Sequence, residues 1–162
     1  MIRRSNNNIK PNGESTRVAV ITGSSSGIGF EIALMLARNG FQTYATMRNL
    51  SKSKNIKSIA TKEYLPIHIE QLDVTDNKSV TNAIQAIVSK ANSIDVLVNN
   101  AGYALTGALE DLSMEEIKAQ YETNLFGLIR TTQAVLPIMR KQKSGTIVNI
   151  SSGAGRFGFP TG

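Results

Sequence analysis

Short segments with little polar alternation recur along the chain, separated by longer stretches of amphipathic character. Residues 18–21 form an unbroken apolar run, which is typical of a strand covered on both faces in a parallel sheet. We predict strands at residues 18–21, 42–47, 67–72, 95–98 and 147–150.

The stretches between these strands have helical spacing. Ile28, Ile32, Met35 and Leu36 share one face of a predicted helix that stops at residues 39–40. A weaker basic helix is predicted near residues 51–62.

Two further helices carry start signals. Asp76 is placed to cap a helix whose apolar positions Val80, Ile84, Ile87 and Val88 recur at helical spacing. Residues 113–116 read Ser-Met-Glu-Glu, a capping box that should open a long helical stretch to about residue 141. Pro137 should kink that helix.

Strands that alternate with helices predict an α/β fold with a doubly wound parallel sheet. Residues 1–16 are polar and aperiodic, so we expect a flexible leader followed by one domain over residues 17–162. The chain has 162 residues, of which 41% are hydrophobic, enough for one buried core.

Composition excludes several functions. The chain has no cysteine and a single histidine, so we expect no metal site, and no apolar run reaches the roughly 18 residues of a membrane span. The first residues lack the apolar core of a secretory signal, and we expect a cytoplasmic protein without membrane contact.

The net charge of +6 is concentrated in the leader and in residues 48–62, where Arg48 and four lysines occur without an acid. A nucleic-acid surface is one interpretation, a solvated tail and helix face is the favoured one, and attraction of a phosphorylated cofactor is a third. No element that would read nucleic acid is recognisable, so we expect no nucleic-acid partner.

A glycine-rich turn follows the first predicted strand. Gly23 allows a sharp turn, Gly27 leaves room for a pyrophosphate near the backbone, and Gly29 permits close helix–strand packing. The helix start adds free N–H groups and the positive end of a dipole. The turn therefore predicts a dinucleotide site, although a glycine turn without a ligand remains the alternative. The absence of a Gly-Lys-Ser/Thr motif excludes a P-loop kinase or GTPase.

Several motifs in order resemble the classical short-chain dehydrogenase/reductase family, over Arg17 to Gly162. The motifs are Thr22-Gly23-x-x-x-Gly27-x-Gly29, Asp73-Val74, Asn99-Asn100-Ala101-Gly102, Asn124, and Val148-Asn149-Ile150-Ser151-Ser152. Segments 44–49 and 103–110 look like its hydroxysteroid and retinol dehydrogenase branch. The resemblance implies a Rossmann-type fold and hydride transfer between a nicotinamide cofactor and a small-molecule alcohol or ketone.

The resemblance also implies roles for individual residues. Asp73 would accept from the adenine amino group, Asn124 would hold a water in a proton relay, and Ser152 would hydrogen-bond the substrate oxygen as catalytic residue. A purely structural role for Asn99, Ala101 and Gly102, and a solvent-facing Asn124, remain alternatives. We expect the cofactor to contact Thr22, Gly23, Ser25, Ser26, Gly27, Ile28, Gly29, Arg48, Asp73, Val74, Asn99, Ala101 and Gly102.

The choice of cofactor depends on the end of the second strand. An acid there would bind the ribose 2′-hydroxyl of NAD, whereas arginine suits a 2′-phosphate. Arg48 stands there with no acid nearby, and its guanidinium matches phosphate geometry. We therefore predict NADP(H) in preference to NAD(H).

The sequence departs from the family after Ser152. The family's base is a tyrosine in a Tyr-x-x-x-Lys pair, and neither residue type occurs among the ten residues that follow Ser152. We expect a C-terminally truncated, poorly stable and inactive fragment of an enzyme whose full-length form is a homo-oligomer. The alternative is a non-enzymatic dinucleotide-binding or regulatory module.

Overall fold

A computed structural model describes residues 16–155 of the chain. The predicted leader lies outside the described residues except for residue 16. The elements in order are β1 (Val18–Ile21), α1 (Gly27–Arg38), β2 (Gln42–Met47), the 3-10 turn η1 (Leu50–Ser53), α2 (Lys54–Lys62), β3 (Ile67–Gln71), α3 (Asn77–Ala91), β4 (Val96–Asn99), η2 (Leu109–Asp111), α4 (Met114–Tyr121), the π-helical segment η3 (Glu122–Phe126), α5 (Gly127–Gln142), β5 (Thr146–Asn149) and η4 (Gly153–Gly155).

The five strands form one parallel sheet in the order β3-β2-β1-β4-β5. The chain therefore runs outward from β1 to β3, returns across β1, and continues from β4 to β5. In the register, Ile21 of β1 lies between Ala45 of β2 and Val98 of β4. The strand order reverses between β1 and β4, the place where open sheets of this kind bind ligands beyond the carboxyl ends of their strands. The predicted doubly wound, Rossmann-type sheet is confirmed.

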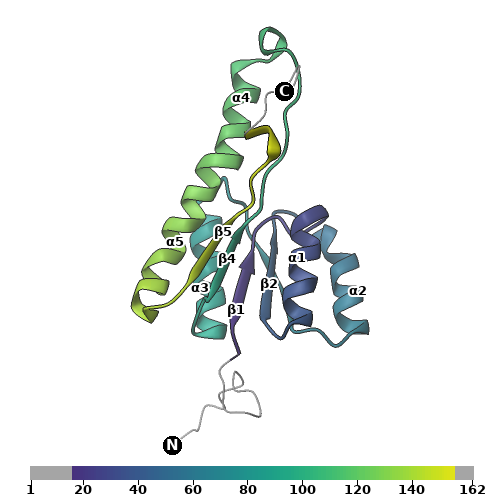
Figure 1. Cartoon of the computed structure of the whole chain (residues 1–162), viewed down its shortest axis with the longest axis vertical. Coiled ribbons are helices and arrows are strands. Elements are labelled where there is room, and N and C mark those ends of the chain that lie inside the picture. The colour runs from purple at the N-terminus through teal and green to yellow at the C-terminus, as the bar shows by residue number, and fades with distance from the viewer. Residues whose placement is uncertain (1–15, 156–162) are drawn as a thin grey trace, which may run out of the picture.

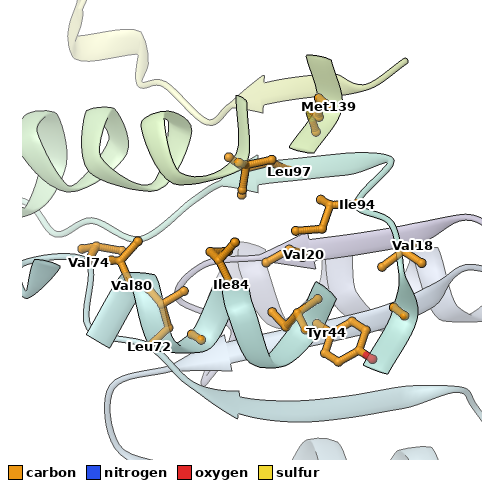
Figure 2. Close-up of a cluster of buried hydrophobic side chains, with 14 residues drawn as sticks. Val18, Val20, Tyr44, Leu72, Val74, Val80, Ile84, Ile94, Leu97 and Met139 are labelled. Atoms are coloured by element: carbon orange, nitrogen blue, oxygen red, sulfur yellow. The ribbon is translucent and has the colours of Figure 1, made fainter. Parts of the chain in front are cut away.

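Helices cover both faces of the sheet (Figure 1). On one face, Val80 and Ile84 of α3 and Val135 of α5 pack with Val20 and Leu97 of the sheet. Figure 2 shows Ile84 pointing toward Val20, with Val74 lying beside Val80.

The opposite face has its own cluster. Leu34 of α1 and Ile56 of α2 pack with Ile21, Ala45 and Val98 there. This two-sided burial explains why β1 lacks polar alternation, since all four of its residues are buried.

The buried face of α1 differs from the predicted one. Ile28 and Met35 are 62% and 53% exposed, while the helix buries Gly29, Ala33, Leu34 and Ala37 against the sheet. The small residues let the helix lie close to the strands, and the larger ones are turned outward. Of the four predicted positions, the two partly buried ones, Ile32 and Leu36, pack against the core.

The long helical stretch begins as predicted but is interrupted elsewhere. Ser113 and Glu116 form the capping box at the start of α4, with Ser113 Oγ accepting from the Glu116 amide at 3.2 Å. The departure from α-helical geometry lies at Glu122–Phe126, a π-helical segment, whereas α5 runs through Pro137 without interruption. Pro137 therefore does not end the helix, and the kink expected there stays a prediction; the π segment lies about three turns earlier.

Every predicted strand end lies within one residue of the observed end. Asp76 caps α3, accepting from the amides of Lys78 and Ser79 at 2.7 and 3.2 Å. No helix within residues 16–155 is long and apolar enough to cross a membrane.

Candidate functional site

The glycine turn between β1 and α1 has a backbone that its glycines make possible. Gly23 and Gly27 have φ of +69° and +62°, in the left-handed region that favours glycine. A Cβ on Gly23 would lie 2.8 Å from Ala101 Cα, and one on Gly29 would lie 2.3 Å from Asn100 Nδ2. A Cβ on Gly27 would meet nothing within 4 Å. The turn is thus packed against the loop after β4 but open at Gly27.

Hydrogen bonds fasten the turn to that loop. Thr22 is buried, and its Oγ1 accepts from the amides of Asn100 and Ala101, both at 3.0 Å. In return, Asn100 Nδ2 donates to the carbonyls of Thr22 and Gly23 at 2.9 and 3.1 Å. The role of Thr22 is to hold the turn in place.

A second set of bonds ties the turn to β2. Ser24 is fully buried, its amide donates to the Thr46 carbonyl at 2.9 Å, and its hydroxyl donates to the Ile21 carbonyl. Asn100 and Ser24 were both missed as site residues. Their positions inside the Asn-Asn-Ala-Gly run and the glycine turn were the available signals.

The start of α1 is suited to an anion. Its N-cap residue Ser26 makes no side-chain capping bond, and the first turn contains no acid. As in any α-helix, its first N–H groups lack intrahelical acceptors; here no Ser26 capping bond satisfies them, and no acid in the first turn compensates the positive end of the helix dipole. Open space at Gly27 lets a ligand approach this backbone. The two features together form a place where a phosphate could bind.

A cavity of about 440 Å³ lies beside this turn, at the carboxyl ends of β1 to β4. Its predicted lining residues are Gly23, Ser25, Arg48, Asp73, Val74, Ala101 and Gly102. Residues that were not predicted complete it, namely Met47, Asn49, Lys52, Leu72, Thr75, Tyr103 and Thr123. The structure thus brings together segments that are far apart in the sequence.

The wall after β2 is basic. It carries Arg48, Asn49 and Lys52, and Asp73 is the single acidic residue among the described residues that line the cavity. The 3-10 turn that holds Lys52 is well fixed, because Asn49 Oδ1 accepts from the Ser51 amide at 2.9 Å and Ser53 is buried. Of the lysines in the basic segment, Lys52 is the one that the structure places at the cavity.

The wall after β3 is a tight turn. Asp73 Oδ1 accepts from the amide and the hydroxyl of Thr75 at 3.0 and 2.8 Å, and the Asp73 amide donates to Ser79 Oγ. The Asp73 side chain therefore both lines the cavity and closes the turn that leads into α3.

Asn99 is the last residue of β4, and it positions the loop that follows. It is 4% exposed. Its Nδ2 donates to Thr132 Oγ1 and Asn149 Oδ1, both at 3.0 Å, and its Oδ1 accepts from Thr131 Oγ1 at 2.6 Å. Asn99 joins β4 to β5 and α5, and it is absent from the cavity lining. The bracing role left open by the sequence is the one seen in the structure.

Asn124 lies in the π segment and clamps the same loop. Its Nδ2 donates to the Tyr103 carbonyl at 2.7 Å, and its Oδ1 accepts from the Tyr103 amide at 3.1 Å. A Cβ on Gly102 would lie 3.1 Å from Asn124 Oδ1, so the contact is close. The side chain is exposed but engaged, unlike a merely solvent-facing asparagine.

Ser152 is exposed after β5, and its hydroxyl accepts from the Ala154 amide at 3.2 Å. Besides Asn99, the predicted site residues that do not line the cavity are Thr22, Ser26, Gly27, Ile28, Gly29, Asn124 and Ser152. No group of acids, histidines or cysteines within the described part of the chain could hold a metal ion.

The chain is similar to known proteins. The family model for short chain dehydrogenases matches residues 17–162. The uncharacterized oxidoreductase YusZ of Bacillus subtilis is 43% identical over 146 residues, which are 89% of this chain and 51% of that protein. Retinol dehydrogenase 8 of Bos taurus is 40% identical, over 90% of this chain and 47% of its own.

A solved structure agrees with these relatives. The actinorhodin polyketide ketoreductase F189W variant with NADPH superposes with a TM-score of 0.86 at 32% identity, covering 90% of this chain and 57% of its own. The chain thus spans about half the length of the relatives it matches. The resemblance seen in the sequence is confirmed: the chain belongs to the short-chain dehydrogenase family, a family of oxidoreductases.

Proposed function

We propose that this chain binds NADP(H) in the cavity beside the glycine turn. It would form the cofactor side of an oxidoreductase that interconverts a hydroxyl and a carbonyl group. The observation that carries the proposal is the cavity itself, which places the glycine turn, at Gly23 and Ser25, next to a basic wall at Arg48 and Lys52.

The residues present fit a dinucleotide with a 2′-phosphate. The free N–H groups at the start of α1 would bind the pyrophosphate. Asp73, whose Oδ1 already closes the turn with Thr75, would contact the adenine. Arg48 and Lys52 would bind the 2′-phosphate, Arg48 through two N–H groups and Lys52 as a point charge. An NAD site would place an acid at Arg48 instead.

The chemistry of the reaction would come from the nicotinamide, which gives or takes a hydride when the cofactor is bound. Ser152, exposed after β5, would donate a hydrogen bond to the substrate oxygen. Asn124 would hold the Gly102–Tyr103 wall of the cavity while the cofactor is bound. The proposal assigns no residue of this chain to the transfer of the proton.

The substrate class follows from the family rather than from a pocket. A retinol dehydrogenase and a polyketide ketoreductase among the similar proteins support an alcohol or ketone as substrate. The NADPH in the ketoreductase supports the choice of cofactor.

The test is the effect of Arg48→Ala on the two cofactors, measured as Kd of the whole protein for NADPH and NADH. We expect a loss of about tenfold or more for NADPH, because a charge-assisted bond to phosphate is removed, and little change for NADH. Lys57→Ala is the matched control, since Lys57 is an exposed cation of α2 outside the cavity lining. Equal losses for both cofactors would refute the proposed site for the 2′-phosphate.

A further inference from the structure

Arg130 of α5 makes three side-chain hydrogen bonds that no sequence motif predicts. Its Nε donates to Asn77 Oδ1, one terminal nitrogen donates to the Val74 carbonyl at 2.5 Å, and the other donates to Glu122 Oε1 at 2.6 Å. The Arg130 side chain is 20% exposed. Its three partners belong to two segments, the turn that leads into α3 and the π segment.

The first segment is one wall of the cavity. Val74 and Thr75 line it, and Asn77 begins α3 two residues after Thr75. Val74 also packs closely against Gly127 of α5. A Cβ on Gly127 would lie 2.7 Å from Val74 Cγ2. The position of Val74 therefore depends on contacts with α5.

The second segment, the π segment Glu122–Phe126, contacts the cavity wall formed by the loop after β4. Glu122 opens the π segment, Thr123 lines the cavity, and Asn124 holds both backbone polar groups of Tyr103. Tyr103 in turn lines the cavity. A contact that fixes the π segment thus also fixes the loop after β4.

The chemistry of arginine suits this junction. A guanidinium presents its N–H groups in a rigid planar fork, so three acceptors can be held at fixed relative positions. An exposed Arg–Glu pair alone would contribute little. Here the same group also satisfies a backbone carbonyl and a helix-start asparagine while it is largely buried.

We propose that Arg130 is a positioning residue of the nucleotide site, which holds the Val74–Asn77 turn and the Glu122–Phe126 π segment at a fixed separation. Through Asn124, it sets the distance between the two walls that face the nucleotide. The consequence for binding rests on the proposed function, whereas the mechanical role of Arg130 does not.

The binding test compares Arg130→Gln, Arg130→Lys and Arg140→Gln in the whole protein, at a temperature where each variant is folded. Arg140 is an exposed arginine of the same helix and serves as the control. We expect Kd for NADPH to rise about tenfold in Arg130→Gln, less in Arg130→Lys, and less than twofold in Arg140→Gln.

A double-mutant cycle separates positioning from general destabilisation. If Arg130 acts through Glu122, adding Glu122→Gln to Arg130→Gln should cost less than about twofold further in Kd, because the shared contact is already lost. Losses that multiply, or an Arg130→Gln variant that binds NADPH as well as the unmodified protein, would overturn the proposal.

Amide hydrogen exchange without nucleotide provides a readout that is independent of the proposed function. The amides of Tyr103 and Thr75 donate to Asn124 Oδ1 and Asp73 Oδ1, so each reports on one wall. Arg130→Gln should speed their exchange about fivefold or more, and leave Val20 in β1 unchanged. Unchanged exchange overturns the role of Arg130. If Arg130→Gln speeds the exchange but the unmodified protein itself does not bind NADPH, the proposed function is refuted and the role of Arg130 stands.

Discussion

The replacement of Gly29 by alanine tests whether the glycine turn is built against the loop after β4. Gly29 is the third residue of α1, and its φ is not in the left-handed region. A Cβ there would lie 2.3 Å from Asn100 Nδ2 and 2.6 Å from the Gly23 carbonyl oxygen. One of these neighbours is backbone, so neither a rotamer change nor a small shift of a flexible side chain relieves both contacts.

The sign of the effect distinguishes this packing from ordinary helix propensity. By propensity alone, alanine in place of a helical glycine should stabilise the protein by about 1 kcal/mol. Overpacking costs roughly 1–3 kcal/mol. Displacing Asn100 Nδ2 breaks its bonds to the carbonyls of Thr22 and Gly23, at about 1 kcal/mol each. The net expectation is a destabilisation of about 3 kcal/mol.

The assay is urea unfolding of the whole protein, followed by far-UV circular dichroism. Gly153→Ala is the control, because a Cβ on Gly153 would meet nothing within 4 Å, and we expect its free energy of unfolding to be almost unchanged. A Gly29→Ala protein as stable as the unmodified one would show that the close approach of Gly29 to Asn100 does not exist.

Three further changes test other parts of the structure. Thr22→Val removes the acceptor of two buried loop amides and should destabilise the protein by roughly 2 kcal/mol in urea unfolding; no loss would contradict those bonds. Asp76→Ala removes the cap of α3 and should cost about 1 kcal/mol in the same assay, and an unchanged midpoint would refute the cap. Desolvation, and secondarily the charge of Lys90, lower the pKa of His68, so the unfolded chain binds its proton more readily. Stability should therefore fall as the pH drops below the usual histidine value of about 6.5, and His68→Gln should flatten that dependence in thermal unfolding.

The sequence was sufficient for the order and type of the main elements. The strands are short and apolar, and the helix starts carry capping residues such as Asp76 and Ser113, which are local signals. It was insufficient for the face of α1, because periodicity weighs large residues such as Ile28 and Met35 above small ones. Because that helix lies close to the sheet, small residues such as its alanines are buried in place of the larger ones.

The interruption of the long helix illustrates a second limit. A proline is a visible breaker, yet α5 accommodates Pro137. The π segment has no comparable local signal. Its side chains contact residues outside the segment: Asn124 donates to the Tyr103 carbonyl, 21 positions earlier, and Glu122 accepts from Arg130, eight positions later.

In the candidate site, too, some residues have a local sequence signal and others are placed only by tertiary contacts. Motif residues such as Gly23, Arg48 and Asp73 were found because each has a recognisable chemistry at a strand end. Lys52 was visible only as one of several lysines, and Thr123 had no signal at all. Their place in the cavity depends on how a 3-10 turn and a π segment are oriented, which is decided by tertiary contacts.

We propose that the basic wall of the cavity, with Arg48 and Lys52, recognises a 2′-phosphate. The most direct measurement is calorimetric titration of the whole protein with adenosine 2′,5′-bisphosphate and with adenosine 5′-monophosphate, which differ only in that phosphate. We predict that the bisphosphate binds about tenfold or more tightly, and that raising the salt concentration reduces the difference, because Arg48 and Lys52 are charged partners. Equal affinities for the two ligands would contradict the claim.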